Sequence, residues 1–118
     1  MESGYCYNNQ DYMRVADGYS YSVGYDFVIH EIDPITTAHT VYYFNPDEYC
    51  PGIDLYNGHA FVADYDYGLR VFDIWPPETS YQVTGLSVPG LALLYPVISD
   101  GYLYMSAWTD GMTILKID

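Results

Sequence analysis

Residues 58–76 read GHAFVADYDYGLRVFDIWP, and this stretch decides the fold. Its first part, 59–63, and its last part, 69–74, are apolar and rich in β-branched and aromatic residues, which is typical of strands. The polar stretch 64–68 between them has the composition of a tight turn, and Pro76 ends the second strand. Apolar residues lie on both alternating faces, which indicates a sheet covered on both sides.

The same strand–turn–strand pattern occurs three times along the chain. A turn glycine recurs with spacings of 40 and 43 residues, at Gly18, Gly58 and Gly101. An isoleucine at the end of the returning strand recurs with spacings of 42 and 43 residues, at Ile32, Ile74 and Ile117. A period near 42 with four strands per unit is typical of β-propeller blades. A four-stranded sheet that is apolar on both faces must stack between copies of itself.

We therefore predict an all-β protein of about ten or eleven short strands, organised as antiparallel four-stranded propeller blades. The chain forms a single domain whose units span about 12–49, 50–89 and 90–118, with 1–11 as a possible blade-completing segment. The alternative fold is an immunoglobulin-like or other sandwich of about ten strands. A sandwich does not explain the internal repetition, which favours the propeller.

Three blades are too few to close a ring, since propellers contain roughly four to eight. The last unit ends after its third strand, at Asp118, whereas residues 5–7 form a spare candidate strand. We expect this spare strand to complete the last blade of another copy, so that two chains make a six-bladed ring. A longer parent protein and an open array of copies are the alternatives.

Composition restricts the partners of this 118-residue chain. The chain has sixteen acidic and three basic residues, and its net charge of −13 repels nucleic acid and anionic lipid. No run of residues approaches the roughly 18 apolar residues of a membrane span. Residues 1–10 lack the basic start and apolar core of a signal peptide. Cys6 and Cys50 have no metal-binding spacing, and the sequence leaves open whether they form a disulfide.

Residues 62–64 (Val-Ala-Asp) and 68–74 (Gly-Leu-Arg-Val-Phe-Asp-Ile), followed by Pro76, resemble the LVIVD repeat, a β-propeller repeat. Leu69, Val71 and Asp73 of this stretch have counterparts in the other two units. These are Phe27, Ile29 and Glu31 in the first unit, and Met112, Ile114 and Lys116 in the third. Lys116 departs from the acidic position of the repeat, so the units share no acid function there. The resemblance covers roughly residues 12–118. It implies a propeller of a bacterial or archaeal surface-associated or secreted protein, without a defined activity.

The turns between the second and third strands of each unit are the predicted ligand-binding site. They collect carboxylates and aromatic side chains, which suit Ca²⁺ coordination, sugar stacking or contact between subunits. The candidates are Tyr25, Asp64, Tyr65, Asp66, Tyr67, Trp108 and Asp110. Ordinary turn use of Asp and plain packing of Tyr are the simpler explanations. Arg70, one of three basic residues, is expected to pair with an acid such as Asp73 or Glu78.

The sequence shows no nucleophile elbow, phosphate loop, zinc motif or Cys–His pattern, so we predict no catalytic residue and no metal ligand. Our leading hypothesis is a non-catalytic module for binding or self-assembly, located outside the cell or on its surface, without a cofactor other than candidate calcium. A carbohydrate-binding propeller, assisted or not by calcium, is the second hypothesis. A glycosidase or lyase that uses paired carboxylates is the third.

Overall fold

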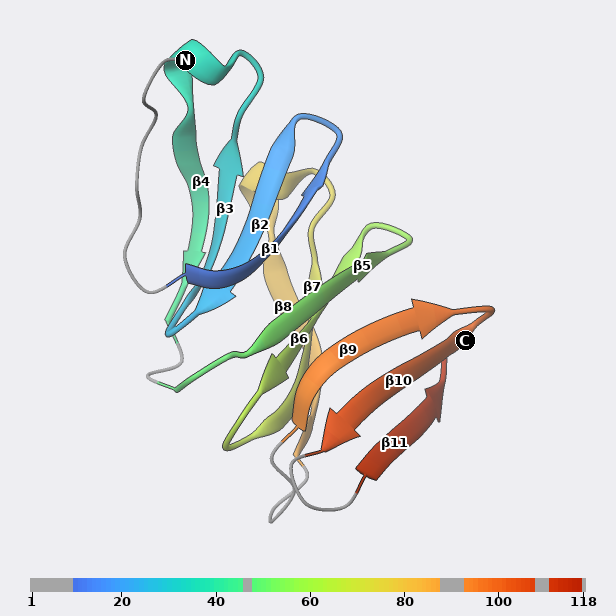
Figure 1. Ribbon diagram of the computed structural model, residues 1–118. Coiled ribbons are helices and arrows are strands. Elements are labelled where there is room, and N and C mark those ends of the chain that lie inside the picture. Colours follow the sequence, from blue (N-terminus) through green and yellow to red (C-terminus); the bar gives the residue numbers. More distant parts are fainter. Residues whose placement is uncertain (1–9, 46–47, 88–92, 108–110, 118) are drawn as a thin grey trace.

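The computed structural model describes residues 10–45, 48–87, 93–107 and 111–117. It is all-β, as predicted: eleven strands form three antiparallel sheets, and two short 3₁₀ helices connect strands (Figure 1). The first sheet contains β1 (Gln10–Ala16), β2 (Tyr19–Gly24), β3 (Phe27–Glu31) and β4 (His39–Phe44). The middle sheet contains β5 (Gly52–Tyr56), β6 (His59–Asp64), β7 (Gly68–Asp73) and β8 (Tyr81–Ser87). The last sheet contains β9 (Leu93–Ser99), β10 (Tyr102–Ala107) and β11 (Gly111–Lys116).

The repetition found in the sequence is also present in the backbone. A two-residue turn joins the first two strands of each sheet, and both of its residues have positive φ, at Asp17-Gly18, Asn57-Gly58 and Asp100-Gly101. These are the Asp-Gly and Asn-Gly pairs that such hairpin turns favour. Each turn glycine also accepts a hydrogen bond from the recurrent isoleucine: Ile32 to Gly18 (2.9 Å), Ile74 to Gly58 (3.0 Å) and Ile117 to Gly101 (2.8 Å). The 3₁₀ helices η1 (Ile35–Thr37) and η2 (Pro77–Thr79) follow in the first two units.

The middle sheet is covered on both faces, which confirms the interpretation of residues 58–76. One face packs against the first sheet in a cluster that includes Tyr21, Val23, Phe27, Ile29, Val62 and Phe72. The other face packs against the last sheet in a second cluster, formed by Phe61, Ala63, Leu69, Val71, Leu103 and Met105. Because side chains alternate along a strand, neighbours in β6 belong to different clusters. A two-sheet sandwich would give a strand only one core, so the sandwich alternative is wrong.

The first strand of each sheet lies at the same edge of the stack. In Figure 1, β1, β5 and β9 follow one another along the molecule, and β5 contacts both of the others. In the described part of the chain, the last sheet has three strands, with β11 at its outer edge. β1 begins at Gln10, two residues before the expected start of the first unit. The spare strand predicted at residues 5–7 lies outside the described residues.

Candidate functional site

The β6–β7 turn uses its first carboxylate for its own structure. Asp64 is fully buried at the end of β6, and its Oδ1 accepts hydrogen bonds from the backbone N–H groups of Asp66 (3.2 Å) and Tyr67 (3.1 Å). Its Oδ2 accepts a hydrogen bond from Nε of Arg70 at 2.8 Å. Both oxygens of Asp64 therefore hold the turn and the arginine.

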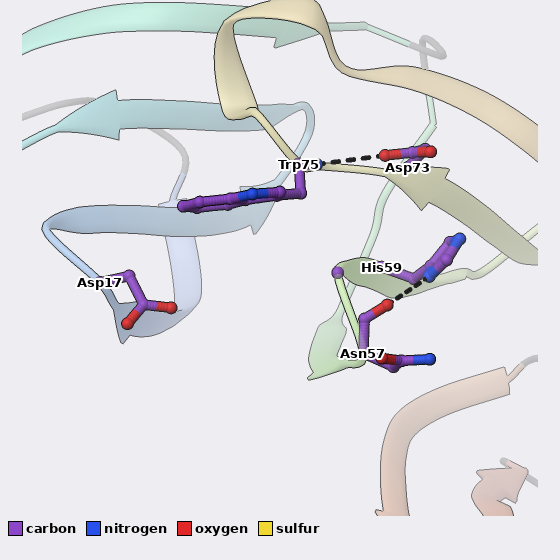
Figure 2. Close-up of a pocket in the computed structure, with 6 residues that line it drawn as sticks. Asp17, Asn57, His59, Asp73 and Trp75 are labelled. Atoms are coloured by element: carbon purple, nitrogen blue, oxygen red, sulfur yellow. Dashed lines mark hydrogen bonds between the residues drawn. The ribbon is translucent and has the colours of Figure 1, made fainter.

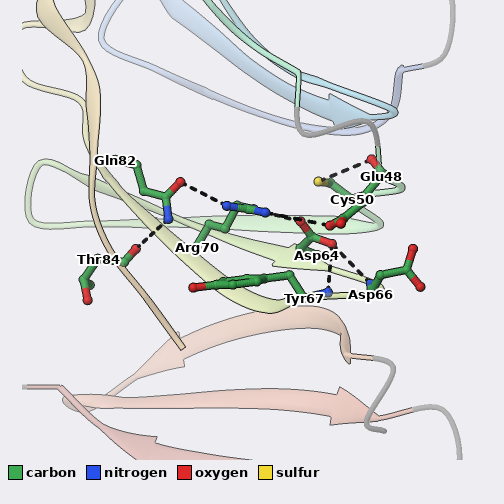
Figure 3. Close-up of polar contacts among 8 residues, drawn as sticks. All are labelled: Glu48, Cys50, Asp64, Asp66, Tyr67, Arg70, Gln82 and Thr84. Atoms are coloured by element: carbon green, nitrogen blue, oxygen red, sulfur yellow. Dashed lines mark hydrogen bonds and ion pairs between the residues drawn. The ribbon is translucent and has the colours of Figure 1, made fainter. Parts of the chain in front are cut away.

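Arg70 is the centre of this arrangement (Figure 3). Besides Asp64, it donates a hydrogen bond from Nη1 to Oε1 of Gln82 at 3.2 Å. Its guanidinium group lies 4.2 Å from the ring centroid of Tyr67 and 5.4 Å from that of Phe44. Phe44 belongs to β4, so Arg70 links the middle sheet to the first one.

Arg70 pairs with acidic residues, as expected, but its partners are Asp64 and Glu48, and the two acids named from the sequence, Asp73 and Glu78, were wrong. Residues 70 and 73 are an odd number of positions apart in β7, so their side chains point to opposite faces of the sheet. Asp73 instead accepts the backbone N–H of Trp75 at 3.1 Å, and Glu78 accepts the hydroxyl of Tyr19 at 3.0 Å.

Glu48 completes the cluster from the segment that precedes β5. Its Oε2 lies 3.8 Å from Nη2 of Arg70. A side-chain hydrogen bond with Asp64, together with burial and the charge of Asp64, raises the pKa of Glu48 to about 7. Cys50 is a buried free thiol beside this cluster, and burial raises its pKa to about 12. The thiol is therefore protonated and unreactive at neutral pH.

The structure brings two of the predicted turns together. Tyr25, in the β2–β3 turn, lies with its ring centroid 5.4 Å from that of Tyr49. Tyr65, in the β6–β7 turn, donates its backbone N–H to the carbonyl of Tyr49 at 2.9 Å. Asp66 is exposed next to them, whereas Trp108 and Asp110 lie outside the described residues. No group of three His, Cys, Asp or Glu side chains in the described part of the chain is placed to hold a metal ion.

An open cavity of about 420 Å³ lies at the other end of the strands from the β2–β3 and β6–β7 turns (Figure 2). Asp17, Asn57, His59, Asp73 and Trp75 line it, together with Gly58. This site could not be predicted from the sequence, because its residues come from three separate turns. One sequence signal nevertheless pointed to it. Asp33 and Trp75 are 42 residues apart and so occupy the same position of the repeat, which means that the large aromatic side chain of Trp75 is not required by the repeat itself.

The outward face of the last sheet is apolar and exposed. Tyr104 pairs with Ile114, and Val97 with Tyr104, in one row across the sheet. The exposed large side chains on this face are Val97, Tyr102, Met112 and Ile114. Tyr95 is also exposed but points elsewhere, since its ring centroid lies 6.0 Å from that of Tyr12 in β1. At the other end of the molecule, the first sheet exposes Met13, Val15 and Tyr43. None of the described helices is long and apolar enough to span a membrane.

Comparison with known proteins identifies similar folds only. No protein-family model and no curated protein match the chain. The crystal structure of the computationally designed Ika4 protein matches with a TM-score of 0.71 over 90% of this chain, at 13% identity. The crystal structure of the computationally designed Ika8 protein matches with a TM-score of 0.65 over 89% of this chain, also at 13% identity. This chain spans 64% of the Ika4 chain and 32% of the Ika8 chain.

Proposed function

We propose that this chain is a non-catalytic β-propeller module that assembles with a second copy of itself, outside the cell or on its surface. The observation that carries the proposal is the exposed apolar face of the last sheet. In the other two sheets, the corresponding face is buried against the next sheet. The last sheet therefore has the surface of an internal blade without the neighbour that such a blade requires.

The correspondence holds pair by pair across the strands. The central pair on this face is Tyr21–Ile29 in the first sheet, Phe61–Val71 in the middle sheet and Tyr104–Ile114 in the last. The side chains of the first two pairs are at most 8% exposed, whereas Ile114 is 52% exposed. Exposed apolar faces of this kind mark contact sites.

The free face of the first sheet supplies a matching surface. Met13, Val15 and Tyr43 lie on the side of the first sheet that faces away from the middle sheet. Placing this surface on the last sheet of another copy continues the stack in the same direction. When two copies make this contact twice, related by a two-fold axis, their sheets form a ring of six. This number lies within the roughly four to eight blades of propeller rings.

Two further observations support the proposal. About a third of the Ika4 chain lies beyond the region that this chain matches, so the matched sheet arrangement occurs there within a longer chain. Residues 62–76 also resemble the LVIVD repeat, whose proteins are surface-associated or secreted propellers. In the ring, residues 5–7 of one copy would complete the last sheet of the other along the edge of β11.

Sedimentation velocity tests the proposal directly, because the wild-type chain is expected to sediment with the mass of two copies. Ile114→Glu places a charge in the centre of the contact and is expected to weaken association at least about 100-fold, which corresponds to roughly 2.7 kcal/mol. Val83→Glu is the matched control: Val83 is 42% exposed on β8, in the middle sheet, which takes no part in the proposed contact between copies, and the charge change is the same. The dimer should also strengthen with salt, which screens the repulsion between two acidic chains.

A wild-type chain that sediments as a single copy at all salt concentrations contradicts the proposal. So does a dimer that Ile114→Glu and Val83→Glu weaken equally. Circular dichroism of both variants verifies that the sheets are intact. Ile114 is exposed in the single chain, so its replacement is expected to leave folding unchanged.

A further inference from the structure

We propose that the cavity beside Trp75 is a binding site for a pyranose ring of a neutral carbohydrate. This inference concerns a different end of the molecule from the sheet faces that mediate the proposed assembly. It begins from Trp75, whose large apolar side chain is 61% exposed next to an open cavity. Among the described residues that line this cavity, Trp75 is the only one with a large apolar side chain.

The repeat shows that the fold does not need a tryptophan at this position. In the first unit, the residue beside the turn glycine is Asp33, whose Cβ lies 3.3 Å from an ideal Cβ built on Gly18. In the middle unit, the Cβ of Trp75 lies 3.6 Å from an ideal Cβ built on Gly58. The two side chains leave the backbone at equivalent places, and one of them is a short carboxylate. The indole is therefore a local feature of this cavity.

The indole and the polar groups lie around one space. In Figure 2 the ring of Trp75 extends towards the side of the cavity on which Asp17 lies, and Asn57 and His59 lie next to each other on the other side. One face of a pyranose presents C–H groups, which pack on an aromatic ring, while its hydroxyl groups point outward to polar partners. The arrangement of a flat apolar platform facing carboxylate and amide groups fits both requirements.

The polar groups retain the capacity to bind hydroxyls. Nδ1 of His59 lies 2.8 Å from the carbonyl of Asn57, so it donates its proton there and leaves Nε2 as an acceptor in the neutral ring. Among the described residues, no hydrogen bond engages the carboxylate of Asp17 or the side-chain amide of Asn57. Carboxylate and imidazole acceptors, with an amide donor, complement the donors and acceptors of sugar hydroxyls.

Charge and size restrict the ligand class. Asp17 and Asp73 line the cavity and the whole chain carries a net charge of −13, so uronic acids and sulfated sugars are repelled. The cavity volume of about 420 Å³ lies within the range of small-molecule sites, roughly 300–1,000 Å³. It is far larger than the volume of an ammonium group. A neutral sugar ring satisfies both restrictions.

Tryptophan fluorescence gives a direct test, because the chain contains two tryptophans and Trp108→Phe leaves Trp75 as the only one. This single-tryptophan chain is titrated with cellohexaose, maltohexaose, mannohexaose and hexa-N-acetylchitohexaose. We expect at least one of these neutral hexasaccharides to change the emission with a Kd of about 1 mM or lower. Hexagalacturonate is expected to bind at least about 10-fold more weakly.

Calorimetry of otherwise unmodified variants completes the test. Trp75→Asp reproduces the residue of the first unit, so it should fold, and it is expected to abolish binding. Asp17→Asn should weaken binding, whereas Tyr81→Ala, at a tyrosine that is 55% exposed outside the cavity, should not. Trp75→Asp should leave the sedimentation mass unchanged, which separates this site from the proposed assembly.

The proposal is overturned if none of the neutral sugars binds, or if Trp75→Asp binds as well as the wild type. An emission change with tetramethylammonium chloride and none with the sugars would show a cation site instead. A loss of the dimer in Trp75→Asp would show a contact between copies.

Discussion

Replacing Arg70 by methionine tests how much the buried ion pair with Asp64, which joins β6 and β7 of the middle sheet, stabilises the fold. The Nε–Oδ2 distance is 2.8 Å, and the two side chains are 16% and 0% exposed. Removing one partner of a buried pair typically costs about 3–5 kcal/mol, because the remaining charge stays buried. Two backbone N–H groups still bind Asp64, so we expect the lower end, about 3 kcal/mol, and a fall in Tm of roughly 10 °C.

Urea unfolding followed by circular dichroism measures this loss, and Arg14→Met is the control. Arg14 lies 3.4 Å from Asp54, but its side chain is 36% exposed, so the loss should stay below about 1 kcal/mol. Asp54 also keeps the backbone N–H groups of Leu55 and Ile98 as donors.

A second variant distinguishes the buried charge from lost packing. In Arg70→Met with Asp64→Asn, the buried charge of Asp64 is removed together with its partner, so this double variant should be more stable than Arg70→Met alone. Asn retains an oxygen for the backbone donors of the turn. The reasoning is refuted if Arg70→Met costs no more than Arg14→Met, or if the effects of the two replacements simply add.

Two further predictions concern the neighbours of this ion pair. The pKa of Glu48 is raised from 4.5 to about 7 in the folded chain, so its contribution to stability is complete below pH 4.5 and is lost as the pH rises through about 7. Glu48→Gln should therefore gain stability relative to the wild type between pH 4 and pH 8 in urea titrations, and a pH-independent difference would contradict this cause. A Cβ on Gly85 would collide with the ring and hydroxyl of Tyr67, so Gly85→Ala should cost about 1–3 kcal/mol by pushing Tyr67 off Arg70. Measured by urea unfolding, that cost should shrink when Tyr67 is replaced by alanine, and equal costs in both backgrounds would exclude the collision as its source.

Much of the architecture could be predicted from the sequence, because periodicity and turn chemistry are local signals. The Asp-Gly and Asn-Gly pairs at 17–18, 57–58 and 100–101 require positive φ and mark the hairpins. The alternation in residues 59–63 showed that both faces of β6 are apolar, and the two clusters follow from it. These features depend on neighbours in the chain.

The candidate site was less accessible to prediction, because it depends on which turns meet in space. Asp64 has the appearance of an ordinary turn aspartate, and only the packing of the first sheet shows that it is fully buried beside Arg70. Glu48 and Phe44 reach Arg70 from the preceding unit, at distances in sequence that no local pattern encodes. The cavity beside Trp75 likewise joins Asp17 to residues 40 to 58 positions later.

The two hydrophobic clusters share no residue, and this has a consequence for the order in which parts of the chain unfold. The central strands rest on neighbours at either side, whereas the terminal strands rest on one side alone. Amide protons of β6 and β7 should therefore exchange with solvent last, and those of β10 and β11 early. Joining a second copy would supply the missing support to both ends at once, so the regions that fray most readily in isolation are those that pairing protects.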